Sequence, residues 1–289
     1  MSGNRLSPCG EDARRHDHDR YLTCLFAPPE RREALFALLA FNGEIARVRD
    51  SVREPMMGRI RLQWWRDALE ALWRPDAPLP SHPVAGPLGA AIRTHRLSRT
   101  HFETLIDARE SDLDEQPPAS LAEFAAYAEA TSAPLLALVL EALGAADWPE
   151  AGRAAAIEAG RHTAIAWALT GLMRALPFHA SRNRTILPAE LFARHRVTPC
   201  AAHGKSGDFR ALAPLVAEVA GLARGHLAEA RRPAGQVPKA SLPALLQASL
   251  AEGYLDALAR SGHDVAAARV QHQPLRPLLL SWRALRGRY

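Results

Sequence analysis

Cysteines are scarce in this 289-residue chain, and their spacing excludes two kinds of cross-link. Cys9, Cys24 and Cys200 lie far apart, and none of them belongs to a C-x-x-C pair. A disulfide framework needs an even number of cysteines, and a structural zinc site needs closely spaced thiolates. We therefore expect reduced thiols and no metal bound by cysteine.

The sequence also lacks a long apolar run and an export signal. Its most apolar segment, residues 134–144, contains a glutamate and is far shorter than the roughly 20 apolar residues of a membrane-spanning helix. Residues 1–12 contain no apolar core followed by a small-residue cleavage site. We therefore expect a cytoplasmic protein without a membrane span.

Strand signals are sparse, whereas helix-forming residues are abundant. Alanine, leucine, arginine and glutamate dominate, and alternating β-branched and aromatic residues are rare. Prolines delimit the helices. They predict one helix of about 22 residues that begins near Pro29 and ends before Pro55, and a longer one near 149–176. We expect an all-α fold with a flexible tail over residues 1–18 and one domain over residues 19–289.

The net charge of +5 and the high isoelectric point, about 9.5, predict attraction to anionic partners. Because the arginines are spread along the chain without an aromatic-flanked basic cluster, the sequence predicts no nucleic-acid binding. An anionic membrane surface remains a candidate partner.

Residues 34–52 combine an apolar run with regularly spaced charges. Residues 34–41 are almost wholly apolar, and Glu44, Arg47 and Asp50 then follow at intervals of three. Residues three apart lie on one helix face, so the arginine can pair with both acids. The stripe is either an ion-paired surface or the remnant of an acidic metal-binding motif, and the spacing alone favours the ion-paired surface.

Three blocks of the sequence resemble the squalene/phytoene synthase family. They cover residues 20–69, 105–127 and 170–191 in the family's order. The resemblance implies the all-α isoprenoid-synthase fold, a single helical bundle around a central cavity. In that family two aspartate-rich motifs hold Mg²⁺ ions that neutralise the diphosphate leaving group of a prenyl substrate.

The first family motif is degraded in this chain. Asn42 and Glu44 precede it, Ala46 and Arg47 stand where two aspartates belong, and Asp50 is the acid that remains. The comparison with the family therefore implies a large loss of the negative charge that would attract Mg²⁺.

The second family motif is degraded as well. Ala175 and His179 stand at its aspartate positions, beside a retained Arg174. We therefore expect no cofactor and no metal, with Mg²⁺ needed only if the chain transfers prenyl groups. A different metal site built from Glu44, Asp50 and His179 is an alternative, because imidazole suits zinc, iron or manganese.

The replacement residues resemble a divergent branch of the family that acts in the assembly of respiratory complex I. The resemblance lies in residues 41–52 and in the Arg-Ala-Leu-Pro-Phe-His segment at 174–179. It implies a non-catalytic bacterial protein that works with complex I subunits or other assembly factors, peripherally on the inner membrane. The alternative is a prenyltransferase that condenses two prenyl diphosphates head to head, with acids of residues 110–115 replacing the lost carboxylates.

A binding role without metal is a further hypothesis. Arginines bind phosphate through bidentate hydrogen bonds, and five of them are candidates to converge near the cavity: Arg47, Arg49, Arg174, Arg182 and Arg184. They would hold an isoprenoid or lipid-like amphiphile, or else several of them simply pair with nearby acids. Tyr127 and Thr131 lie on a helix that lines the pocket in the family and are candidate ligand contacts.

Overall fold

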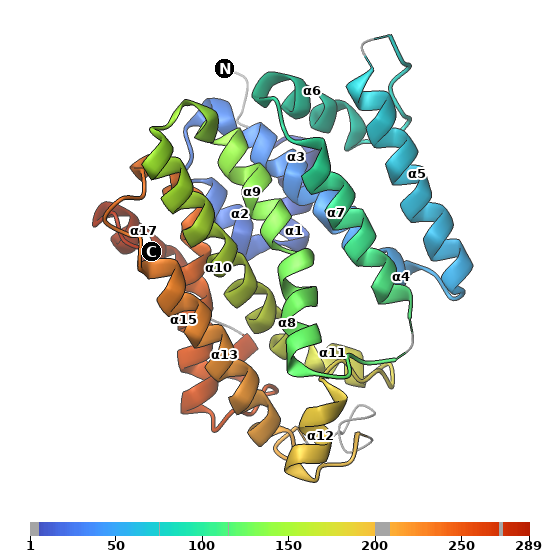
Figure 1. Ribbon diagram of the computed structural model, residues 1–289, viewed down its shortest axis with the longest axis vertical. Helices are drawn as coiled ribbons and strands as arrows, with labels where there is room; N and C mark the ends of the chain where they lie inside the picture. The colour runs from blue at the N-terminus through green and yellow to red at the C-terminus, as the bar shows by residue number, and fades with distance from the viewer. Residues whose placement is uncertain (1–5, 75, 115, 200–208, 272–273) are drawn as a thin grey trace. The chain divides into compact units, whose positions relative to one another are not determined.

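The computed structural model describes residues 6–74, 76–114, 116–199, 209–271 and 274–289, and the regular elements within these ranges are all helices (Figure 1). The all-α prediction is confirmed. Cys9 and Cys24 are free and buried, and Cys200 lies outside the described residues.

The chain divides into two compact units. Unit 1 comprises Met1–Asp114, Pro134–Ile157 and Gln236–Ala244, and unit 2 comprises Glu115–Ala133, Glu158–Gly235 and Leu245–Tyr289. Two helices, α10 (Glu150–Arg174) and α14 (Leu242–Leu245), run across the division. The single domain over residues 19–289 stays a prediction.

Unit 1 is built around a helix that is apolar on all sides. Its elements are α1 (Pro8–His16), α2 (His18–Cys24), α3 (Pro29–Ala46), α4 (Val48–Ser51), α5 (Pro55–Trp73), α6 (Ala85–His95), α7 (Arg99–Glu110), η1 (Ser111–Leu113), α9 (Ala133–Ala142), η2 (Ala145–Asp147) and η4 (Lys239–Ser241). Residues 34–42 of α3 are all buried, as expected for a helix without a polar face. Phe41 from this helix meets Trp65 and Phe102 edge to face, with ring centroids 5.2 and 5.3 Å apart.

The predicted flexible tail over residues 1–18 is wrong for its second half. Ser7 caps α1 by accepting a hydrogen bond from the Gly10 N–H at 3.0 Å, and Cys9 and Ala13 are buried where α1 packs on α3. The segment looked polar because apolar positions are few, but a cap and small buried residues suffice to dock a short helix.

The predicted single helix ending at Pro55 is also interrupted. It ends at Ala46 and resumes as α4 after Arg47, which caps α3. Pro55 then occupies the first turn of α5, where a proline costs no hydrogen bond. The interruption separates Glu44 from Asp50.

Unit 2 contains the rest of the helices. They are α8 (Leu121–Ala130), the second part of α10, α11 (Leu176–Ala180), α12 (Ala189–His195), α13 (Ala213–Arg231), α15 (Gln247–Arg260), α16 (Ala268–Gln271) and α17 (Arg276–Leu285). Helix α15 packs against α13, α16 and α17 (Figure 1). The predicted long helix near 149–176 is confirmed as α10, which stops before Pro177.

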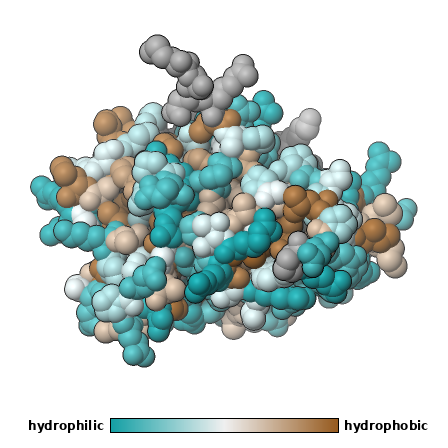
Figure 2. Space-filling model, turned by 90° about the horizontal axis from the view of Figure 1, so that it is seen from above, coloured by the Kyte–Doolittle hydropathy of each residue, from teal (hydrophilic) through white to brown (hydrophobic). Residues whose placement is uncertain are grey.

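One segment of the described residues is long and apolar enough to cross a membrane. It spans Leu121–Ala142, with a mean hydropathy of 1.2, and half of its most apolar window is buried within the protein. A core helix meets the same criterion, so the absence of a membrane span stays a prediction. On the face seen from above in Figure 2, apolar and polar residues are interspersed.

Candidate functional site

The first motif position in unit 1 is held by an ion pair. Arg47 Nη2 donates to Glu44 Oε1 at 2.9 Å and lies 3.6 Å from Asp12 Oδ1 of α1. Gly43 makes room for this arrangement, because a Cβ at that position would lie 3.1 Å from the Arg47 guanidinium. The predicted pairing of Glu44 with Arg47 is confirmed, and the helix α1 supplies a second acid.

Glu44 also faces an aromatic cluster. The second carboxylate oxygen of Glu44 lies 3.8 Å from His82 Nε2. The His82 ring in turn lies against Trp65 and Trp64, at centroid distances of 4.9 and 5.5 Å. The carboxylate is therefore shared between an arginine and a histidine, which is a structural role.

The other residues of the first motif do not add metal ligands. Asn42 is buried on α3, Ala46 ends that helix, and Arg49 and Asp50 lie on α4 after the interruption. The side chain of Asp50 is exposed. Helix α3 ends at Ala46 and α4 begins at Val48, so Glu44 and Asp50 do not lie on one continuous helix. A common stripe of Glu44, Arg47 and Asp50 stays a prediction.

The second motif position in unit 2 is cationic and aromatic. The guanidinium of Arg174, the last residue of α10, lies 3.7 Å from the ring centroid of Tyr254, which is only 1% exposed. Arg276 donates a hydrogen bond to the Tyr254 hydroxyl and lies 5.5 Å from the same ring. Gln271 donates to the Arg174 carbonyl at 3.2 Å and fixes the end of α10. We call Arg174, Tyr254 and Arg276 the Tyr254 cluster.

Burial changes the proton affinity of all three members of the Tyr254 cluster. It lowers the pKa of Arg174 and of Arg276, because the charged form loses hydration. Burial raises the pKa of Tyr254, and the nearby Arg174 charge partly opposes this rise. Arginine stays charged at neutral pH even when burial lowers its pKa, so the cluster places two guanidinium groups beside one neutral phenol.

The residues that follow Arg174 form a turn and a short helix. Ala175 donates its N–H to the Gly171 carbonyl at 2.9 Å, and α11 begins one residue later. On α11 the His179 ring meets the Phe178 ring edge to face at 5.3 Å, and Arg182 lies 3.9 Å from the Phe178 centroid. His179 and Arg182 thus both contact one exposed aromatic ring.

Neither motif position has the donors that Mg²⁺ requires. At the first position an arginine occupies the space beside Glu44, and at the second an alanine and a histidine replace the carboxylates. Within the described ranges, no cluster of three or more His, Cys, Asp or Glu side chains could hold a metal ion. A catalytic step through Mg²⁺ therefore does not fit these residues.

Tyr127, Thr131 and Arg184 are the remaining candidate ligand contacts. Thr131 is buried, and its hydroxyl donates to the Tyr127 carbonyl at 2.8 Å. Arg184 lines an apolar hollow in unit 2 together with Leu176, Ala180 and neighbouring residues. The hollow has a volume of about 10 Å³, which is room for a single water. Ligand contacts by Tyr127, Thr131 and Arg184 stay predictions. So does the convergence of all five arginines, because Arg47 and Arg49 belong to unit 1 and the other three to unit 2.

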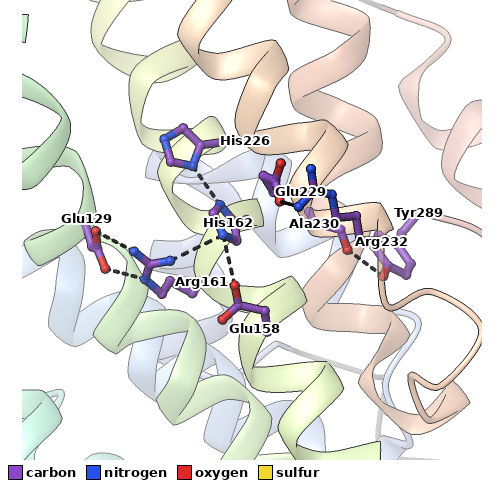
Figure 3. A network of polar contacts seen from close by, with 9 residues as sticks. All are labelled: Glu129, Glu158, Arg161, His162, His226, Glu229, Ala230, Arg232 and Tyr289. Atoms are coloured by element: carbon purple, nitrogen blue, oxygen red, sulfur yellow. Dashed lines mark hydrogen bonds and ion pairs between the residues drawn. The ribbon is translucent and has the colours of Figure 1, made fainter.

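The structure brings together a histidine pair that the sequence did not predict (Figure 3). The Nδ1 atoms of His162 on α10 and His226 on α13 lie 2.8 Å apart, so one donates a proton and the other accepts it. His162 also lies 3.1 Å from Glu158, and its neighbour Arg161 pairs with Glu129 at 2.6 Å. Only the four-residue spacing of Glu158 and His162 was visible in the sequence.

Burial, the neighbouring His162 and Arg161 lower the pKa of His226, against smaller opposing effects of Glu129 and Glu229. His226 therefore favours its neutral form more strongly than a free imidazole does.

A family model identifies the chain. The model of the squalene/phytoene synthase family matches residues 13–276, which is most of the sequence. The chain belongs to the squalene/phytoene synthase family. Both the predicted family and its isoprenoid-synthase fold are confirmed.

Curated relatives within this family fall into two groups. NADH dehydrogenase (ubiquinone) complex I, assembly factor 6 from Bos taurus is 36% identical over 279 residues, covering 95% of this chain and 81% of that protein. Its Homo sapiens counterpart is 33% identical over the same share of each chain. Presqualene diphosphate synthase from Rhodopseudomonas palustris is 29% identical over 224 residues, covering 76% of this chain and 75% of that enzyme.

Solved structures agree with the family fold. A dehydrosqualene synthase in complex with a ligand superimposes with a TM-score of 0.79 at 16% identity, covering 96% of this chain and 94% of that one. Squalene synthase HpnC from Alicyclobacillus acidocaldarius gives a TM-score of 0.73 at 19% identity, covering 89% and 93%. At these identities the likeness supports the squalene/phytoene synthase fold and says nothing of activity.

Proposed function

We propose that this protein assists the assembly of respiratory complex I at the membrane surface and does not transfer prenyl groups. It would work with complex I subunits or other assembly factors, peripherally on the inner membrane of a bacterium. The observation that carries the proposal is the replacement of carboxylates at both family motifs, in a chain similar to assembly factor 6 over 95% of its length.

The replaced residues supply a physical reason for losing the synthase reaction. That reaction needs metal ions to neutralise a departing diphosphate. Arg47 instead neutralises Glu44, and Ala175 and His179 offer no carboxylate. Neither motif therefore supplies the negative charge that gathers Mg²⁺ around a substrate.

The Tyr254 cluster supports a binding role in place of catalysis. Arg174 and Arg276 place two guanidinium groups against one phenol ring. Guanidinium groups bind phosphate in the absence of metal. We infer that the cluster holds the anionic head of an isoprenoid or lipid-like amphiphile, with no cofactor.

A deletion in the organism that encodes the protein tests the assembly role. We expect the loss of assembled complex I and of NADH-dependent quinone reduction, restored by a plasmid copy of the gene. Succinate-dependent quinone reduction serves as the control and should not change. Normal complex I activity in the deletion strain would refute the assembly role.

The alternative function, head-to-head condensation of two prenyl diphosphates, is favoured by the similarity to presqualene diphosphate synthase. Purified protein given farnesyl diphosphate and Mg²⁺ should release no diphosphate, whereas the Rhodopseudomonas palustris enzyme under the same conditions should. Restoring carboxylates with Ala46→Asp, Ala175→Asp and His179→Asp asks whether a dormant site remains. Turnover by the unmodified protein would establish the alternative.

A further inference from the structure

Helix α17 in unit 2 carries an uncovered apolar stripe. Leu275, Leu278, Trp282 and Leu285 are 68, 68, 47 and 87% exposed. Leu275 is the N-cap residue of α17, and since successive helical residues are 100° apart, the other three positions fall within about 60° of arc on one face. Leaving four large apolar side chains of a short helix in water is unfavourable unless another surface covers them.

The opposite face of α17 is firmly attached to the rest of unit 2. Leu280 is fully buried, Arg283 donates to Glu252 Oε2 of α15 at 2.9 Å, and Arg276 reaches Tyr254. The chain after the helix is held as well, because the Tyr289 hydroxyl donates to the Ala230 carbonyl at 3.0 Å. Helix α17 therefore packs against α15, and its apolar stripe is exposed.

The charged side chains of the segment that carries the stripe are all arginines. Residues 275–289 contain four arginines and no aspartate or glutamate. Arg286 and Arg288 are exposed, and the guanidinium of Arg286 lies 4.3 Å from the Trp282 ring. Tryptophan and arginine together suit the boundary between lipid headgroups and acyl chains, where an aromatic ring is partly buried and a guanidinium meets phosphate.

We propose that α17 docks this protein onto an anionic lipid bilayer, with the stripe Leu275, Leu278, Trp282 and Leu285 inserted at the headgroup boundary. The proposal rests on the membrane-surface part of the proposed function and names the element that makes the contact. Charge complementarity selects the occupant, because anionic headgroups neutralise the arginines. A second copy of this chain would bring the same exposed arginines, Arg286 and Arg288, to the same interface, where like charges repel.

Vesicle binding tests the proposal. The purified protein is mixed with vesicles of phosphatidylcholine alone or with 30 mol% phosphatidylglycerol, and the bound fraction is measured by flotation at low and high salt. We expect binding to the anionic vesicles, weaker binding at high salt and little binding to the neutral ones. The double variant Leu278→Glu/Trp282→Glu should lower the partition coefficient at least about tenfold. Arg286→Gln and Arg288→Gln should each lower it about fivefold.

Two further variants separate membrane contact from loss of fold. Ile157→Glu on α10 introduces the same charge at an apolar position that is 50% exposed and should bind vesicles like the unmodified protein. Leu285→Glu changes only the most exposed residue of the stripe and should weaken binding with an unchanged thermal unfolding midpoint.

Three outcomes would overturn the proposal: no binding to anionic vesicles, equal binding to neutral ones, or unchanged binding of both glutamate variants of α17. A dimer that Leu278→Glu disperses, without vesicle binding, would assign the stripe to a second copy. Vesicle binding together with normal complex I in the deletion strain would refute the assembly role alone, whereas lost complex I without vesicle binding would refute the docking helix alone.

Discussion

Arg47 and Arg174 occupy the two degraded family motifs, and their surroundings differ in the charge of their partners. Arg47 lies between Glu44 and Asp12, with 38% of its side chain exposed. Arg174 lies on the Tyr254 ring with Arg276 nearby, and burial lowers its pKa. The arginine of the first motif pairs with carboxylates, while the arginine of the second motif lies on an aromatic ring.

This difference indicates where a ligand would bind. An exposed ion pair adds about 0–1 kcal/mol to stability and restricts little else. Placing two guanidinium groups around a buried phenol costs hydration, and such a cost is common where a site serves binding. We therefore locate ligand recognition at the Tyr254 cluster rather than at Glu44 and Arg47.

Removing the Tyr254 ring should cause the largest loss of stability. Tyr254→Ala deletes a side chain that is 1% exposed, and we expect the free energy of unfolding to fall by about 4 kcal/mol. Tyr254→Phe keeps the ring and should lose only about 1 kcal/mol, from the hydrogen bond of Arg276. Urea denaturation of both variants measures these changes. A loss below about 1 kcal/mol for the alanine variant would show that the ring does not organise the cluster.

Replacing Arg174, the arginine at the second motif, should weaken ligand binding much more than it lowers stability. Arg174→Met keeps much of the side-chain volume and removes a charge whose pKa burial already lowers, so stability should change by less than about 1.5 kcal/mol. The affinity for inorganic diphosphate without Mg²⁺, measured by calorimetry, should fall at least about tenfold. Arg47→Met is the matched control and should retain the affinity. Equal losses in the two variants would contradict the assignment of binding to unit 2.

The histidine pair should make the stability of the protein depend on pH, because His226 can lose or gain a proton. The pKa of His226 is lowered in the folded state, so the unfolded chain binds more protons as the pH falls below about 6.5. The stability contributed by neutral His226 is therefore complete above that pH, and it is lost as the pH falls from the unfolded pKa to the lowered folded pKa. His226→Asn should reduce this decrease in urea titrations at pH 7 and pH 5. The pKa of His95 is also lowered, so His95 adds its own loss of stability under acid. Because His95 is present in both the unmodified protein and the His226→Asn variant, the effect of His226 is the difference between their two pH dependences.

The sequence predicted local features well and long-range contacts poorly. The apolar run at 34–41 correctly indicated a buried helix, and the three-residue spacing of Glu44 and Arg47 correctly indicated an ion pair. No local sequence pattern predicted that Asp12 also lies near Arg47, because this contact depends on how α1 packs on α3. Tyr254 and Arg174 meet through the packing of α10 and α15, and periodicity within one helix cannot predict such a meeting.

The smallest effect is expected from the ion pair at the first motif. Arg47→Ala should lower the free energy of unfolding by less than about 1 kcal/mol, because its partners and its own side chain are accessible to water and salt. A double-mutant cycle with Glu44→Gln should give a coupling energy of about 0.5 kcal/mol that vanishes in 1 M salt. A salt-resistant coupling above about 2 kcal/mol would mean that Arg47 is as strongly constrained as Arg174. The contrast between the ion-paired arginine of the first motif and the arginine on the aromatic ring of the second would then fail.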